Sequence, residues 1–303
     1  MKKFFTTILI FLAFLLTGQS QTDSLLRDSI STDSTNGKLI VYKYDIKEQI
    51  APPVWRTTQK AFEAASEAKA NLMLIHMNTY GGLVDAADSI RTKILGSRIP
   101  VYVLIDNNAA SAGALISIAC DSIYMVEGAN IGAATVVDQT GNVVPDKFQS
   151  YMRSMMRSTA EANGRDPQIA QAMVDPSIYV PGVSDSGKVL TFTTSEAIRH
   201  GFAEGKAESI EEVMKLAGHE NYEIIHHTLK PLDKVINILI HPAISGILIM
   251  IIIGGLYFEL QTPGIGFPLG AAVFAALLYF APLYLEGLAT HWEVIVFVLG
   301  IIL

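Results

Sequence analysis

The chain has 303 residues, a formal net charge of −7 at pH 7 and a hydrophobic share of 50%. Its mean hydropathy of +0.36 is high for a water-soluble protein and indicates membrane segments. The acidic balance argues against a nucleic-acid partner, which would require a basic face. The one cysteine, Cys120, lies in an apolar run, where a buried structural thiol is expected rather than a nucleophile.

The N-terminal residues have the pattern of an export signal. Two lysines precede the apolar run Phe4–Leu16, and the small residues Gly18 and Ser20 follow it. We expect a signal peptide over residues 1–20 that is removed, with an uncleaved anchor as the alternative. Residues 21–38 are polar and rich in Ser, Thr and Asp, which is typical of a flexible linker.

From residue 39 to about residue 230, strand and helix patterns alternate. Apolar runs predict strands at 39–44, 71–77, 101–105, 122–126 and 188–192. Helical spacing and stop signals predict helices at 52–69, 83–94, 112–120, 146–163 and 195–201, the last opened by a capping box at Thr193–Glu196. Strands that alternate with helices of this length predict an α/β domain with a parallel sheet over residues 39–230.

The composition changes after residue 230. Residues 238–258 and 265–284 carry no charge, and each is long enough to cross about 30 Å of hydrocarbon. We expect a transmembrane helical region over residues 231–303, with buried helices of a soluble core as the alternative. A third apolar run begins near Trp292 and is too short to span, so we expect a longer natural protein. Lysines before the first span favour a cytoplasmic soluble domain, whereas the export signal favours an extracytoplasmic one, which we follow.

Two small-residue turns follow buried strands. In NTYGGLV (residues 78–84), Gly81 and Gly82 leave backbone N–H groups uncovered at a helix start, where a developing oxyanion could be bound. In AASAG (residues 109–113), Ser111 heads a helix of small residues, and the N–H of Ala112 is at hand. Taken alone, the glycine pair also fits an ordinary strand-to-helix turn, and Ser111 also fits a helix N-cap serine.

A nucleophilic serine needs a base, and no histidine occurs between residues 77 and 199. Lys147 is the one lysine between residues 112 and 187, in the first turn of a predicted helix. The positive end of the helix dipole and burial would both favour the neutral amine that a lysine base needs. A solvated surface lysine is the alternative. No grouping of residues predicts a metal site.

Taken in order, these motifs resemble a known family. The glycine pair, the ASAG turn, the loop ending IGAATVV (residues 131–137) and the helix that carries Lys147 are similar to the ClpP/crotonase-fold serine peptidases. Within them, residues 145–175 and YFELQTPGIGFPLG (residues 257–270) resemble the membrane-bound NfeD-type group, which is related to signal peptide peptidase A. The expected fold is therefore a ClpP/crotonase-like βαβ domain followed by a transmembrane helical region.

The resemblance implies a role for each motif residue. Ser111 would be the nucleophile and Lys147 the general base of a Ser–Lys dyad, and Gly82 and Ala112 would supply the oxyanion N–H groups. Gly81 and Tyr80 would bind substrate, although the position of Tyr80 is often proline in the family. The implied partners are the membrane, a stomatin- or prohibitin-like protein and further copies of the chain. No cofactor is implied.

One further stretch resembles a phosphate-binding loop. Residues 182–188 match most of one, but Val189 stands where a Ser or Thr would bind magnesium, and no helix is predicted next. The main hypothesis is therefore an ATP-independent serine endopeptidase, anchored in the membrane, that cleaves hydrophobic segments of stomatin-like proteins. The alternatives are a non-catalytic membrane scaffold for such partners and a crotonase-like acyl-CoA enzyme.

Overall fold

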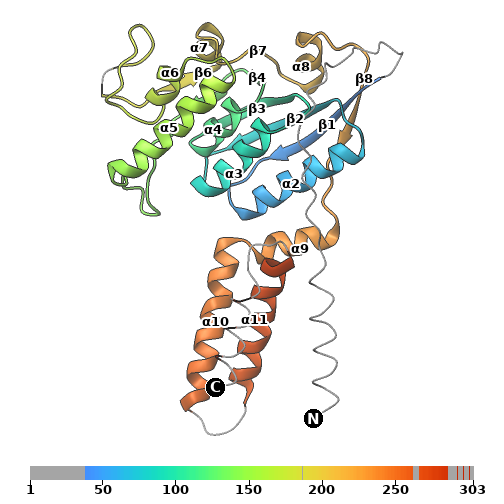
Figure 1. Cartoon of the computed structure of the whole chain (residues 1–303), viewed down its shortest axis with the longest axis vertical. Helices are drawn as coiled ribbons and strands as arrows, with labels where there is room; N and C mark the ends of the chain where they lie inside the picture. Colours follow the sequence, from blue (N-terminus) through green and yellow to red (C-terminus); the bar gives the residue numbers. More distant parts are fainter. Residues whose placement is uncertain are drawn as a thin grey trace, which may run out of the picture. The chain divides into compact units, whose positions relative to one another are not determined.

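The computed structural model describes residues 38–185, 187–261 and 266–285, together with Trp292, Val296 and Gly300 (Figure 1). The expected signal peptide, the linker up to Gly37 and nearly all of the third apolar run lie outside the described residues. The strands are β1 (Leu39–Ile46), β2 (Leu72–Thr79), β3 (Val101–Ala110), β4 (Ser122–Met125), β5 (Asn130–Gly132), β6 (Thr191–Thr193), β7 (Gly205–Lys206) and β8 (Tyr222–His226). The helices are α2 (Pro52–Glu67), α3 (Val84–Leu95), α4 (Ala112–Ile118), α5 (Asp146–Ala162), α6 (Pro167–Ala172), α7 (Thr194–Arg199), α8 (Ile210–Leu216), α9 (Pro231–Leu239), α10 (Pro242–Gln261) and α11 (Phe267–Leu285).

The strands form one sheet whose order is β6-β5-β3-β2-β1-β8, with β4 also paired to β3 and β7 to β4. Every pairing is parallel except that of β5 with β6. The long strand β3 changes partner along its length: Tyr102–Ile105 pairs with β4, and Asn108–Ala110 pairs with β5. The parallel α/β sheet confirms the expected fold class. Because β3 changes partner, its last residues before α4 pair with β5 and no longer with β4.

The two faces of the sheet bury different clusters. Because strand side chains alternate, Tyr44, Ile75 and Val103 lie on the face that packs against α2, α3, α4 and α5 (Figure 1). Leu74 and Leu104 belong to a smaller cluster that includes Val213 and Met214 of α8. The larger cluster contains α4 and Cys120, whose burial raises the pKa of its thiol, as expected of an inert structural cysteine.

Three sequence expectations need correction. The third strand does not stop at Ile105 but runs on to Ala110, because Asn108–Ala110 pairs with β5. The strand expected at 188–192 is only three residues long and antiparallel to β5. The first long apolar helix begins at Pro242 rather than at residue 238, since α9 ends before it at Leu239. The capping box of Thr193 and Glu196 is confirmed.

The helices α10 and α11 are long and apolar enough to cross a membrane. They pack against each other through Leu248 and Ile252 of α10 and Ala275 and Ala276 of α11. Their outward residues include large exposed apolar side chains such as Met250 and Phe274, which suits a lipid environment. The two helices correspond to the two spans expected from the sequence.

The C-terminal ends of the central strands carry a charged cluster on the face opposite the larger core. His76 of β2 lies between two carboxylates, with Nδ1 3.5 Å from Asp45 and Nε2 3.4 Å from Asp106. Lys43 pairs with Asp45 at 2.8 Å, and Lys47 lies 3.9 Å from Asp106. Burial, followed by the charges of Lys47 and Lys43, lowers the pKa of His76 below its ordinary value of 6.5, against the opposing effect of the two aspartates.

This lowered pKa predicts that acidification destabilises the domain. The unfolded chain binds the His76 proton near pH 6.5, whereas the folded chain resists it, so stability is full above that pH and declines as the pH falls toward the folded-state pKa. We expect the melting temperature to drop between pH 7.5 and 5.5, and to drop less in His76→Gln. His219→Gln is the matched control, because His219 is a partly exposed histidine that follows α8 and lies outside the strands. An equal drop in wild type and His76→Gln would contradict the prediction.

Candidate active site

The two small-residue turns lie side by side at one edge of the sheet. The glycine turn follows β2 and the serine turn follows β3, and these strands are parallel neighbours, with Thr79 paired to Ala109. The carboxyl ends of adjacent parallel strands meet at the same edge. Gly113 of α4 also packs closely on β2, because a Cβ placed on it would lie 2.7 Å from Thr79 Cγ2. The sheet therefore brings together two motifs that are about thirty residues apart in the sequence.

Ser111 occupies a strained backbone conformation, with φ +54° and ψ −118°. Such angles cost of order 1–3 kcal/mol in a residue other than glycine and persist only where the surroundings hold them. The Ser111 N–H donates to the Gly132 carbonyl at 2.8 Å, which fixes the turn from the β5 side. The Ser111 side chain makes no capping hydrogen bond to α4. Ser111 is therefore the N-cap residue of α4 by position, as the plain interpretation expected, but its hydroxyl does not cap the helix, and its geometry is that of a sharp strand-to-helix turn that presents the hydroxyl.

The glycine turn presses against Ser111 and has no room for side chains. A Cβ placed on Gly81, whose φ is +103°, would lie 2.6 Å from Ser111 Cβ and 3.1 Å from Ser111 Oγ. A Cβ on Gly82 would lie 2.1 Å from the carbonyl oxygen of Ile50. Ile50 bridges this turn, since its N–H donates to the Gly81 carbonyl at 2.9 Å and its carbonyl accepts from the Leu83 N–H at 2.7 Å. Neither bond of the bridge uses the Gly82 N–H.

An open cavity of about 860 Å³ contains these groups. Ser111, Gly81, Gly82 and Tyr80 all line it, and Tyr80 is 81% exposed. Its other lining residues are Lys47, Glu48, Gln49, Asn78, Thr79, Leu83, Ala133, Thr135, Val137, Asp138, Gln139 and Val189. Ala112 is not among the lining residues, but it follows Ser111 as the first residue of α4, so its N–H belongs to the four that a helix leaves without an intrahelical partner. The cavity thus gathers a serine hydroxyl, backbone N–H groups and an apolar wall.

Lys147 does not join this group. It lies in the first turn of α5 as expected, but it is exposed rather than buried, and it is not among the residues that line the Ser111 cavity. Its Nζ instead lies 4.8 Å from the centre of the Phe148 ring, a cation–π contact. The expectation that burial would favour the neutral amine is therefore wrong for this structure.

Several cavity residues were not anticipated from the sequence. The segment Lys47–Gln49 follows β1, and its place at the carboxyl end of a parallel strand is the signal that could have located it. Asp138 begins a tight loop, and hydrogen bonds from the Thr140 side chain and the Asn142 backbone hold the pKa of the Asp138 carboxyl below its usual value. This loop closes on itself through the Val137–Val143 bridge. No motif in the sequence marks it as part of a site.

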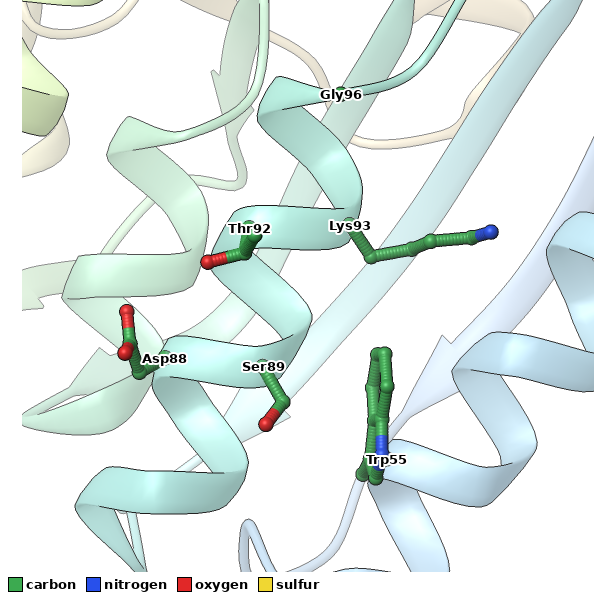
Figure 2. Close-up of a pocket in the computed structure, with 6 residues that line it drawn as sticks. All are labelled: Trp55, Asp88, Ser89, Thr92, Lys93 and Gly96. Carbon is green, nitrogen blue, oxygen red and sulfur yellow. The ribbon is translucent and has the colours of Figure 1, made fainter. Parts of the chain in front are cut away.

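A second hollow, of about 460 Å³, lies between α2 and α3 (Figure 2). Trp55 comes from α2, and Asp88, Ser89, Thr92 and Lys93 come from α3. Two of these polar groups are already engaged: the Ser89 hydroxyl donates to the Asp85 carbonyl of its own helix at 2.9 Å, and Lys93 Nζ lies 5.6 Å from the ring centre of Phe62 on α2. Ser89 is therefore engaged by its own helix, unlike Ser111, and this hollow is the weaker candidate.

Comparison with known proteins gives two family matches. Residues 40–227 match the family described as "NfeD1b, N-terminal domain", and residues 243–303 match "NfeD integral membrane domain". The chain is 35% identical over 267 residues to the membrane protein NfeD1b of Bacillus subtilis, covering 88% of this chain and 61% of that protein. It is 27% identical to the membrane-bound protease PH1510 of Pyrococcus horikoshii, covering 75% of this chain and 54% of that protein. The chain thus spans somewhat over half the length of these relatives.

The solved structures that resemble this chain include forms of the 1510-N membrane-bound stomatin-specific protease. A serine-to-alanine mutant of it matches with a TM-score of 0.57 at 26% identity, covering 64% of this chain and 100% of that one. A lysine-to-alanine mutant, in complex with a substrate peptide, matches with a TM-score of 0.58 at 26% identity, covering 67% and 98%. These matches confirm the expected ClpP-class α/β fold, and the integral membrane domain match and α10 and α11 identify a membrane protein.

Proposed function

Because the chain belongs to the NfeD family, we propose that it is a membrane-bound serine peptidase whose nucleophile is Ser111. The observation that carries the proposal is the strained turn at Ser111, packed against Gly81 in an open cavity. A hydroxyl held in this way is available to a ligand, because it makes no capping hydrogen bond to its own helix. The similarity to a protein named a membrane-bound protease supports the reaction class.

The proposed reaction is acyl transfer to Ser111. Its Oγ attacks a peptide carbonyl while neutral Lys147 takes the hydroxyl proton, and the N–H groups of Gly82 and Ala112 bind the oxyanion of the tetrahedral intermediate. The C–N bond then breaks, Lys147 returns the proton to the leaving amine, and water hydrolyses the acyl-enzyme with Lys147 as base again. No step uses ATP, a metal or another cofactor. The mechanism requires the first turn of α5 to bring Lys147 over the cavity, since Lys147 is exposed in this structure.

We propose that the substrates are apolar segments of stomatin-like membrane proteins. The cavity wall formed by Tyr80, Leu83, Val137 and Val189 suits apolar side chains, with Gly81 and Tyr80 contacting the substrate backbone. The solved relative with a bound substrate peptide is named stomatin-specific, which supports the partner class. Further copies of this chain are also proposed partners, as the resemblance to the family implies.

We also propose the arrangement in the membrane. The signal pattern of residues 1–20 and the linker 21–38 lead into the peptidase domain 39–230, which we place on the extracytoplasmic side. Residues 231–303 form a multi-pass region that includes α10 and α11. Protease accessibility of the 39–230 domain in oriented membrane vesicles tests the side, because only an exposed domain is digested without detergent.

The role of Lys147 predicts a specific loss. Lys147→Ala and Lys147→Arg should each lower kcat by about 10³-fold, because a base of the general acid–base kind contributes 10²–10⁴-fold and arginine stays protonated. Lys47→Ala tests the competing lysine, because Lys47 lines the Ser111 cavity, whereas Lys147 does not line it. Lys215→Ala is the control, because Lys215 is also an exposed helix lysine but lies in α8, outside the cavity lining. Loss of cleavage in Lys47→Ala with activity retained in Lys147→Ala would show that the base is misassigned.

The exposed position of Lys147 favours one alternative, a non-catalytic scaffold that binds a stomatin-like partner. A fluorophosphonate probe separates the two functions, because it labels only an activated serine. Labelling of the wild-type chain that disappears in Ser111→Ala supports the peptidase. Equal, background labelling of both proteins, with partner binding kept, supports the scaffold.

A further inference from the structure

The segment Lys47–Ala51, between β1 and α2, is shared by two hollows. Lys47, Glu48 and Gln49 line the Ser111 cavity. Glu48 also lines a smaller hollow of about 240 Å³ at the junction with α9 and α10. The other residues of that hollow are Pro53, Asn237, Ile238, His241 and Ile244. One short segment thus forms part of the candidate active site and part of the contact with the helices that lead into the membrane region.

The same segment holds the glycine turn in place through backbone hydrogen bonds. The Glu48 carbonyl accepts from Thr79 Oγ1 at 2.7 Å, and Thr79 Oγ1 in turn accepts from the Gly81 N–H at 3.1 Å. Ile50 is fully buried and makes both bonds of the bridge to Gly81 and Leu83. A shift of Ile50 must therefore move the backbone that carries the Gly82 N–H.

A clamp between α2 and α9 fixes the other end of this segment. The Arg56 guanidinium donates to the Asp233 carboxylate at 2.8 Å and to Asn237 Oδ1 at 3.3 Å. The Asn237 side-chain amide donates to Thr57 Oγ1 at 3.1 Å. The Arg56 side chain is 4% exposed, so its charge needs compensation, to which Asp233 contributes. Arg56 lies on α2, whose N-terminal end follows directly after Ile50 and Ala51. Asp233 lies on α9, whose C-terminal end leads into α10.

We infer that the Arg56–Asp233 clamp is a positioning device for the reaction. Docking of α9 on α2 holds α2, and α2 continues from Ile50 and Ala51, so the docked state sets the place of the Gly82 N–H relative to Ser111. The position of the membrane-proximal helix therefore sets the rate of the chemical step and leaves substrate binding largely unchanged. This inference rests on the proposed peptidase function for its catalytic consequence, but its structural consequence is independent of it.

The direct test uses Asp233→Asn in the full chain, solubilised in detergent micelles. The variant keeps the shape of the side chain and removes the negative charge that pairs with buried Arg56 across the clamp. We expect kcat to fall by about 10- to 100-fold with KM within about twofold, because a small misplacement of a catalytic group carries that cost. Glu223→Gln is the matched control: it also converts an acid to its amide, but its ion pair with Lys38 is exposed, whereas Asp233 pairs with buried Arg56. Unchanged kcat in Asp233→Asn would overturn the inference.

A disulfide can restore the docked state in the same protein. Thr57→Cys and Asn237→Cys replace two side chains that already contact each other, and the one native cysteine, Cys120, is buried with a raised thiol pKa. In the Asp233→Asn background, oxidation of this pair should recover most of the lost kcat, and reduction should remove it again. A kcat that stays low in the oxidised, folded protein would mean that Asp233 acts by another route and would overturn the clamp.

Hydrogen–deuterium exchange separates the inference from the proposed function. Asp233→Asn should speed exchange in peptides that cover residues 79–83, whereas Glu223→Gln should not. This readout needs no catalysis. Faster exchange in a chain whose wild type shows no Ser111-dependent cleavage would refute the peptidase proposal and leave the clamp standing. Unchanged exchange in these peptides would refute the clamp, whatever the activity.

Discussion

Replacing Ser111 with alanine is expected to lower kcat for peptide cleavage by about 10⁴-fold or more, because loss of the nucleophile removes the covalent route altogether. Folding should be little affected, with a change in unfolding free energy within about 1 kcal/mol. The Ser111 side chain makes no capping bond to lose, and alanine meets the same backbone strain at φ +54°. The measurement is cleavage of a peptide with an apolar segment by the full chain in detergent, alongside its melting temperature.

Ser89→Ala is the control for this substitution. Ser89 lies in the hollow between α2 and α3, where its hydroxyl is bound by the Asp85 carbonyl, so its loss removes no group from the Ser111 cavity. We expect Ser89→Ala to cleave at the wild-type rate. Cleavage by Ser111→Ala at the wild-type rate would refute the assignment of the nucleophile, and equal losses in both variants would point to a general effect on the fold.

Contacts on two sides hold the strained backbone of Ser111 in place. The backbone around it is held by the Gly132 carbonyl on one side and by the close approach of Gly81 on the other. The first contact exists because β3 pairs with β5 beyond the point where it leaves β4, and the second because β2 pairs with β3 as far as Thr79 and Ala109. A turn held from two sides can keep a serine at positive φ, which an isolated helix start could not do.

The sequence predicted this site largely through small residues. The glycine pair and the ASAG turn stand directly after buried strands, and apolar runs of that kind locate a parallel sheet, so the meeting of the two turns follows from topology. The five residues that extend β3, Asp106–Ala110, were missed because Asp, Asn and Ala disfavour strands locally. Tertiary pairing makes this stretch extended, since Asn108–Ala110 pairs with β5 and Ala109 also pairs with Thr79 of β2.

Lys147 and Ile50 show the limits of such reasoning in opposite ways. Lys147 was found by elimination, as the one lysine in its stretch of sequence, but elimination says nothing about which way a side chain on an amphipathic helix points. Ile50 was missed because a buried isoleucine between a strand and a helix looks like ordinary core. Its role lies in its backbone N–H and carbonyl, which bridge the glycine turn, and a side-chain pattern carries no information about them.

Replacing Gly82 with alanine is expected to damage both activity and stability. The added Cβ would lie 2.1 Å from the Ile50 carbonyl oxygen and 2.6 Å from its nitrogen, and backbone atoms cannot step aside as a flexible side chain can. The bridge between Ile50 and the glycine turn must therefore open, and the Gly82 N–H must move. We expect kcat to fall by about 10²- to 10³-fold, as for loss of one oxyanion donor, and the unfolding free energy to fall by about 1–3 kcal/mol.

Gly218→Ala separates this clash from the general cost of replacing a glycine. Gly218 follows α8, has φ +78° and has open space where a Cβ would go. Alanine there meets only backbone strain, about 1–2 kcal/mol, and leaves the Ser111 cavity untouched. Stability alone would therefore rank the two variants close together, whereas kcat should fall only in Gly82→Ala. If Gly82→Ala loses stability but keeps the wild-type kcat, the oxyanion is bound elsewhere, and the N–H groups at the start of α4 become its sole proposed site.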